Sequence, residues 1–273
     1  MSFPSGLGVG DVAAWDASVV HRYLSLFGEA ALDMLLTARG GDLAHLGCRT
    51  GYPDTLFATR LGEGTIVGVD PSPAALKVAR QKAAFIQGVR IEYRQADRFP
   101  TDLPSASFTH VVSLHPEPLP SSRRALLEEM ARLLLPTGQA LLALPMRGSF
   151  QEIVDLLREY TVKHDDVLLS RALDEATTAR PTVDLLTEEL ERAGFSHVDI
   201  DLWPTVIDFG SGRELFDDPI VRLLVVPELE QLLGRDDLDA PLAYVKEAID
   251  CYWPSGGFEL PVNVGCASGR RLS

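Results

Sequence analysis

The segment with the clearest capacity for chemistry is a glycine-containing turn in the first fifth of the chain. It runs from Gly47 to Gly51, between an apolar stretch and a stretch of helical periodicity. Glycines allow backbone N–H groups to approach a ligand closely, and the N-terminus of the following helix favours anionic groups. Arg49 stands where the GxGxxG spacing of dinucleotide-binding proteins has its second glycine. The turn therefore predicts a nucleotide-like ligand and disfavours a nicotinamide or flavin cofactor.

A carboxylate follows this turn at the distance expected for a ribose contact. Asp70 ends a β-branched stretch, about twenty residues beyond the glycine turn. One carboxylate can accept hydrogen bonds from both hydroxyls of a ribose diol. The alternative is that Asp70 only caps the next helix, because Ser72 and Pro73 also suit a helix start.

A second acidic residue comes after the next predicted strand. Asp97 lies in the sequence Gln95-Ala96-Asp97-Arg98. Its short side chain could accept a hydrogen bond from an adenine amino group, or it could be a solvated acid at a strand end.

One histidine is a candidate for acid–base chemistry. His115 follows the fourth predicted strand, where an acceptor molecule would enter, and an imidazole has a pKa close to neutral. The alternative is an ordinary loop histidine. His164 and the two aspartates after it do not have metal-ligand spacing, so the sequence predicts no metal site.

The elements that position these residues alternate between strands and helices. The strands are predicted at 42–46, 65–69, 90–93, 108–113 and 139–144, and the helices between them at 53–61, 73–84 and 121–134. This order predicts parallel βαβ units, whose ligands bind at the carboxyl ends of the strands.

The remaining segments extend this arrangement at both ends. A leading amphipathic helix is predicted at 16–38, further helices at 150–164 and 182–193, and two more strands at 196–208 and 259–267. We expect a single domain over 1–273, with an N-terminal helical segment at 1–40 and a helical insertion at 212–254 that would serve as a lid.

Composition limits the classes of partner. The 273 residues include 39 acidic and 25 basic side chains, a formal net charge of −14 that repels nucleic acids and anionic membranes. No basic leader opens the chain and no stretch reaches the roughly 18 apolar residues of a membrane helix. The three cysteines have no CxxC spacing, which favours a reducing compartment. We therefore expect a cytoplasmic protein without nucleic-acid or membrane partners.

Taken together, six segments resemble a known family. They are LAHLGCRTG, IVGVDPSPAALKVAR, RIEYRQADRFP, FTHVVSLHPEPLP, ALLEEMARLLLPTGQALLALP and FELPVNVGCASGRR. They resemble class I S-adenosylmethionine-dependent methyltransferases of the ubiquinone/menaquinone-biosynthesis type, with a degenerate first motif. The resemblance implies a Rossmann-like α/β fold with a seven-stranded, mostly parallel sheet, helices on both faces and an antiparallel last strand. It also implies S-adenosyl-L-methionine as co-substrate and methyl transfer to a small organic acceptor.

The resemblance also implies roles for individual residues. Gly47 and Gly51 would line the methionine and ribose portions of the cofactor, and Asp70 would hold the ribose. Asp97 and Arg98 would flank the adenine. Two further pocket positions are His45 and Arg49, and Ser113 would face the methionine end.

Three positions depart from the family pattern. The family usually has an acid at the position of His45, a glycine at Arg49 and commonly an acid at Thr109. A histidine supplies no fixed negative charge, and the Arg49 side chain must point to solvent, displace the ligand or recruit an anionic group. These departures leave two hypotheses open: an active methyltransferase, or a non-catalytic relative that acts as a binding or regulatory module with a protein partner.

Overall fold

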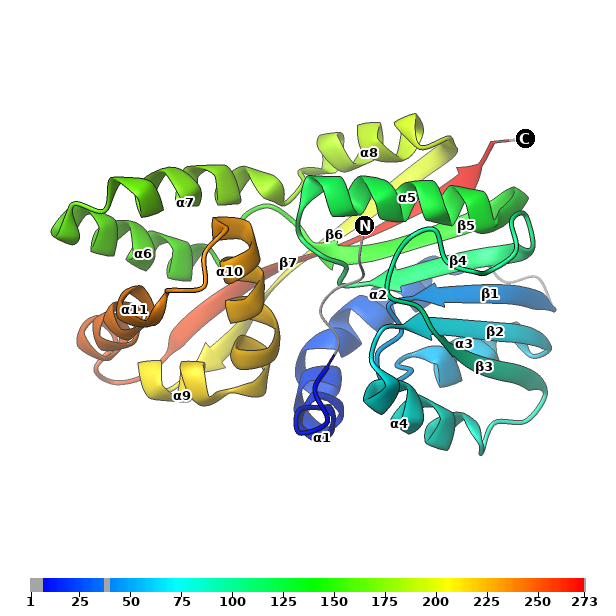
Figure 1. The fold of residues 1–273 in the computed structure, drawn as a ribbon, viewed down its shortest axis with the longest axis horizontal. Coiled ribbons are helices and arrows are strands. Elements are labelled where there is room, and N and C mark those ends of the chain that lie inside the picture. Colours follow the sequence, from blue (N-terminus) through cyan, green and yellow to red (C-terminus); the bar gives the residue numbers. More distant parts are fainter. Residues whose placement is uncertain (1–6, 37–39, 273) are drawn as a thin grey trace.

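A seven-stranded sheet forms the centre of the molecule in the computed structural model, which describes residues 7–36 and 40–272 (Figure 1). The strand order is β3-β2-β1-β4-β5-β7-β6, with β7 antiparallel to both of its neighbours and the other pairs parallel. The strands are β1 (Gly41–Leu46), β2 (Gly64–Asp70), β3 (Val89–Gln95), β4 (Phe108–Leu114), β5 (Leu134–Pro145), β6 (Phe195–Phe209) and β7 (Phe258–Arg271). The predicted Rossmann-like α/β fold is confirmed.

Helices cover both faces of the sheet because the central strands are apolar on both sides. In β1, Leu43 packs into the core cluster that includes the N-terminal helices, whereas Ala44 and Leu46 pack into the cluster under the opposite helices. This alternation is the two-residue period of a strand buried on both faces. The helices that join these strands are α3 (Asp54–Leu61), α4 (Pro73–Ala83) and α5 (Pro120–Leu133).

The N-terminal helices close one side of the cleft at the carboxyl ends of the strands. They are α1 (Val12–Ala14), η1 (Trp15–Leu24) and α2 (Ser25–Met34). The helix predicted at 16–38 therefore ends earlier, because Leu35 adopts an extended conformation, and residues 37–39 lie outside the described residues. The hydroxyl of Thr50 donates to Asp16 at 2.7 Å, which ties η1 to the glycine turn.

A group of helices lies beyond the end of β5 and beside the long strands β6 and β7 (Figure 1). It contains α6 (Gln151–His164), α7 (Val167–Ala179), α9 (Gly212–Asp217), η2 (Val221–Val225), α10 (Val226–Leu233) and α11 (Asp239–Tyr252), whereas α8 (Val183–Arg192) packs on β6. Helix α7 was not predicted; its N-cap is Asp166, whose side chain accepts from the Leu169 N–H at 2.9 Å. The helices over 212–252 pack on α6 and α7, and their action as a lid stays a prediction. Across the described ranges, no helix is long and apolar enough to cross a membrane.

Candidate functional site

The glycine turn after β1 is held in an unusual backbone conformation. Gly47, Arg49 and Gly51 have φ values of 75°, 48° and 77°, in the left-handed region. A Cβ atom on Gly51 would lie 2.5 Å from the Tyr93 hydroxyl, so this position requires glycine. A Cβ atom on Gly47 would meet none of the described residues within 4 Å, so this face of the turn is open.

Asp70 lies at the end of β2, directly beside this turn, and is completely buried. Its Oδ2 accepts from the Arg49 backbone N–H at 3.1 Å, and its Oδ1 accepts from the Ser72 N–H at 2.9 Å. The side chain that caps α4 is that of Ser72, whose hydroxyl accepts from the Ala75 N–H at 3.2 Å. Asp70 instead accepts hydrogen bonds from the backbone of the glycine turn and of Ser72.

The Arg49 side chain lies inside the cleft and does not extend into solvent. It is 14% exposed, its Nε lies 3.9 Å from Asp70 Oδ2, and its guanidinium lies 5.4 Å from the centre of the Trp15 ring. Arg49 lines two small cavities of about 20 and 10 Å³ beside the turn. Arg49 thus fills much of the space beside the glycine turn.

His45 belongs to a buried hydrogen-bonded chain that sequence analysis missed. Its Nδ1 lies 2.6 Å from Asp54 Oδ1, and Asp54 Oδ2 accepts from the Tyr93 hydroxyl at 2.8 Å. Burial, followed by the Asp54 charge, raises the pKa of Tyr93, so the phenol keeps its proton and donates. The buried Asp54 therefore places a negative charge next to the position where the family has an acid. The one available signal was an acid in the first turn of α3, nine residues after His45.

The other predicted site residues lie around or away from this centre. Ser113 is buried and its hydroxyl donates to the Leu46 carbonyl at 2.9 Å, whereas Asp97 and Arg98 are exposed just after β3. Thr109 lies at the opposite end of β4, where its hydroxyl donates to the Asp42 carbonyl at 3.0 Å. The departure at Thr109 is therefore remote from Asp70. The cofactor roles of these residues stay predictions.

His115 is held between the N-terminal helices and α10. Its φ is 50°, its Nε2 lies 2.8 Å from the Tyr23 hydroxyl and its Nδ1 lies 3.3 Å from Glu228 Oε1. Because a carboxylate only accepts, we assign the proton to Nδ1 and the Tyr23 O–H as donor to Nε2. Burial lowers the pKa of His115, although the charge of Glu228 acts in the opposite direction. The lowered pKa favours a neutral ring at pH 7. Glu228 also pairs with Arg180 at 2.5 Å.

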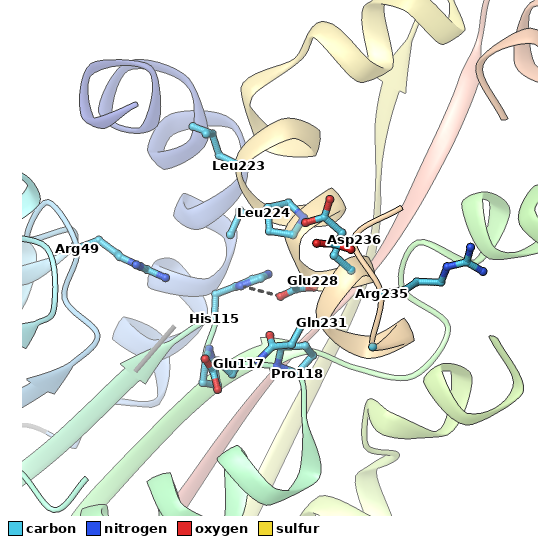
Figure 2. A pocket seen from close by; sticks show the side chains of 14 residues that line it. Arg49, His115, Glu117, Pro118, Leu223, Leu224, Glu228, Gln231, Arg235 and Asp236 are labelled. Atoms are coloured by element: carbon cyan, nitrogen blue, oxygen red, sulfur yellow. Dashed lines mark ion pairs between the residues drawn. The ribbon is translucent and has the colours of Figure 1, made fainter. Parts of the chain in front are cut away.

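The largest cavity beside these residues, about 590 Å³, lies between the β4–α5 segment and the helices η2 and α10 (Figure 2). Both Arg49 and His115 line this cavity and also both small cavities, so they separate the glycine turn from the larger space. Its charged lining is mainly acidic, comprising Glu117, Glu228, Glu230 and Asp236 together with Arg49 and Arg235. The glycine turn, which is of a nucleotide-binding type, thus lies on one side of Arg49 and His115. A cavity large enough for a small molecule lies on the other side.

Comparisons with known proteins agree with this geometry. Residues 44–138 match the family described as a methyltransferase domain. The structure is similar to that of the YcgJ protein from Bacillus subtilis, with a TM-score of 0.59 and 13% identity, over 91% of this chain and 99% of that one. It is also similar to phosphoethanolamine N-methyltransferase 2 from Haemonchus contortus, solved with S-adenosyl-L-methionine, with a TM-score of 0.57 and 16% identity, over 97% of this chain and 58% of that one.

Residues 44–138 are therefore similar to a methyltransferase domain, and the chain has the class I methyltransferase fold, as its motifs predict. The narrower likeness to ubiquinone/menaquinone-biosynthesis enzymes stays a prediction.

Proposed function

We propose that this protein transfers a methyl group from S-adenosyl-L-methionine to a small organic acceptor. The observation that carries the proposal is the separation of two spaces by Arg49 and His115. The glycine turn and Asp70 lie on one side, and the cavity of about 590 Å³ lies on the other. Methyl transfer needs an acceptor space that adjoins the cofactor space, because the nucleophile must approach the methyl group in line, and the two spaces adjoin at Arg49 and His115.

The residues beside the turn fit the cofactor. The open face of Gly47 leaves room for a ligand against the backbone, and Asp70 can accept from ribose hydroxyls. Asp97 and Arg98 lie at the exposed rim, where they would flank the adenine. The bound cofactor would supply an electrophilic methyl group on a sulfonium. The small cavities of about 20 and 10 Å³ require the Arg49 side chain to move before the cofactor enters.

His115 is the candidate acid–base residue on the acceptor side. Its neutral ring would take a proton from an O–H or N–H nucleophile that replaces the Tyr23 hydroxyl at Nε2. With an acceptor in hand, we expect His115→Gln to lower kcat about 100-fold and to leave the affinity for S-adenosylhomocysteine unchanged. An unchanged kcat would remove His115 from the chemistry.

A second candidate function is a non-catalytic binding or regulatory module. One observation favours it: Arg49 lies against Asp70 inside the cleft, where the cofactor ribose would sit. In that case a protein partner would replace the small-molecule acceptor, and the fold would serve as a scaffold.

Calorimetric titration with S-adenosylmethionine and S-adenosylhomocysteine separates the two functions. We expect micromolar binding by the natural chain and its loss in Asp70→Asn, with the melting temperature of the variant as a folding control. Binding by Arg49→Gly but not by the natural chain would contradict the enzymatic proposal and would favour the non-catalytic function.

A further inference from the structure

The charged side chains on the wall of the large cavity do not balance one another (Figure 2). The cavity of about 590 Å³ is lined by more carboxylates than guanidinium groups, namely Glu117, Glu228, Glu230, Asp236, Arg49 and Arg235. Glu228 is already paired with Arg180. Arg235 is paired with Asp237 at 2.6 Å and with Asp166 at 3.4 Å, and its side chain extends away from the other labelled side chains in Figure 2.

Three carboxylates of this wall remain without a cationic partner. In the part of the chain that the structure describes, Glu117, Glu230 and Asp236 form no ion pair. Glu117 accepts a hydrogen bond from a neutral group, the Ser122 hydroxyl, at 2.7 Å. Unpaired carboxylates around one space stabilise a cation there and repel an anion.

The uncharged part of the same wall is largely apolar. It comprises Pro116, Pro118, Leu223, Leu224 and Pro227. Leucine and proline side chains suit the carbon skeleton of a ligand, and the cavity has the volume of a small-molecule site. The lining therefore fits an organic molecule that carries a positive charge.

We propose that the methyl acceptor is an organic cation whose charged nitrogen is held by Glu230 and Asp236, an inference that rests on the proposed function. Glu117 also lines the cavity of about 20 Å³ beside the glycine turn, whereas Glu230 and Asp236 line the large cavity alone. A nitrogen held by these two acids is kept away from the positive sulfonium of the cofactor and from the Arg49 guanidinium, which lies toward Asp70.

This placement leaves the other end of the acceptor free to react. The charged nitrogen is bound at α10 and the segment after it, and the nucleophile then lies at His115, which lines the same cavity and the two cavities beside the turn. Glu230 and Asp236 are thus specificity residues: they bind the acceptor and take no part in the proton transfer. Acceptors that carry a carboxylate or a phosphate at this end are repelled.

The test compares probes that share a skeleton and differ in charge. One set is 2-phenylethylamine, 2-phenylethanol and 3-phenylpropionate, and the other is hexylamine, hexanol and heptanoate. Ligand-observed NMR gives their dissociation constants with the full chain at about 150 mM salt, where long-range attraction to the acidic surface is screened. In at least one set, we expect the amine to bind about tenfold more tightly than the alcohol and the carboxylate to bind most weakly.

A double variant locates the preference in the cavity. Glu230→Gln with Asp236→Asn should reduce the advantage of the amine over the alcohol to less than about threefold. The matched control is Glu191→Gln with Glu247→Gln, which changes the net charge equally at exposed positions of α8 and α11. We expect the control to keep the tenfold advantage.

The outcomes separate this inference from the proposed function. Equal binding of amine and alcohol, no binding of any probe, or an amine preference that survives in the Glu230 and Asp236 variant would overturn the inference. Calorimetry with S-adenosylhomocysteine tests the cofactor side independently, so the proposed function would stand in each of these cases if that ligand binds. Absence of cofactor binding by the natural chain would overturn both.

Discussion

The two sides of the Arg49–His115 boundary are built differently. On the glycine-turn side two buried carboxylates accept hydrogen bonds at both oxygens: Asp70 from two backbone N–H groups, and Asp54 from His45 and Tyr93. The cavities there measure about 10 and 20 Å³. A ligand can enter this side only if the Arg49 side chain leaves its place beside Asp70.

The acceptor side is open by comparison. Its cavity measures about 590 Å³, and the Arg235 guanidinium on its wall is committed to Asp237 at 2.6 and 2.9 Å. Over 7–36 and 40–272, neither Glu230 nor Asp236 forms an ion pair. Ion pairs tie this wall to the rest of the molecule: Glu228 reaches His115 and Arg180. Arg22 pairs with Asp218, and Arg222 pairs with Asp11 at 3.2 Å. The difference indicates a closely packed side at the glycine turn, where we propose that the cofactor binds, and an open side whose Glu228–Arg180 contact is buried at both ends.

Removal of that contact should have the largest effect. Glu228→Ala leaves the Arg180 guanidinium buried without its carboxylate partner, and such a loss costs about 3–5 kcal/mol in the free energy of unfolding. Urea denaturation measures it. The matched control is Glu230→Ala on the same helix, for which we expect a change within about 0.5 kcal/mol. Equal effects of the two variants would contradict the importance of the buried Glu228–Arg180 contact for this wall.

The next effect concerns the side at the glycine turn. Asp70→Asn should weaken S-adenosylhomocysteine binding at least about 100-fold, because it removes the charge of the carboxylate that we propose accepts from two ribose hydroxyls. Asp97→Asn, at the exposed rim, should weaken binding less than about tenfold. Calorimetry of both variants sharpens the comparison, and a larger loss in Asp97→Asn would place the main polar contact at the rim.

The buried chain behind His45 should contribute a smaller amount to stability. Tyr93→Phe removes the hydrogen bond to Asp54 Oδ2 and leaves that buried oxygen unpaired, at a cost of about 1–3 kcal/mol. Tyr252→Phe is the control, since its hydroxyl donates to Glu159 at the surface and its loss should leave the free energy of unfolding nearly unchanged. A Tyr93→Phe protein as stable as the natural chain would show that the side at the glycine turn is less rigid than its hydrogen bonds indicate.

The smallest effect is a dependence of stability on pH. Burial lowers the pKa of His115 and His110 below the ordinary value of 6.5, so the unfolded chain binds more protons just below that pH. The free energy of unfolding should therefore fall as pH drops from about 6.5 to 5, by at most about 1.4 kcal/mol per unit for each histidine. His115→Gln should flatten this slope in urea titrations. A stability that rises over this range would contradict the assignment of a neutral ring.

The strands of the sheet could be predicted from the sequence more completely than the contacts of the candidate site. Strands such as β1 and β2 are continuous apolar segments because helices bury both of their faces. Such apolar runs can be recognised in the sequence. Helix α7 was missed; its start depends on one capping contact from Asp166.

In the site, Asp70 follows from its spacing after the glycine turn, whereas the partners of the two histidines do not. Tyr23 and His115 are 92 residues apart in sequence, and Tyr93, which continues the hydrogen-bonded chain of His45 through Asp54, is 39 residues from Asp54. These contacts exist only because the sheet order places β1 between β2 and β4 and the N-terminal helices over the strand ends.

A crystal structure of the protein with S-adenosylhomocysteine tests the central claim most directly. The account predicts Asp70 oxygens within hydrogen-bond distance of both ribose hydroxyls, with the Arg49 side chain displaced from its present place beside Asp70. A ligand bound at another place would contradict the account. So would crystals soaked to saturation in which no ligand lies at the turn and Arg49 still contacts Asp70.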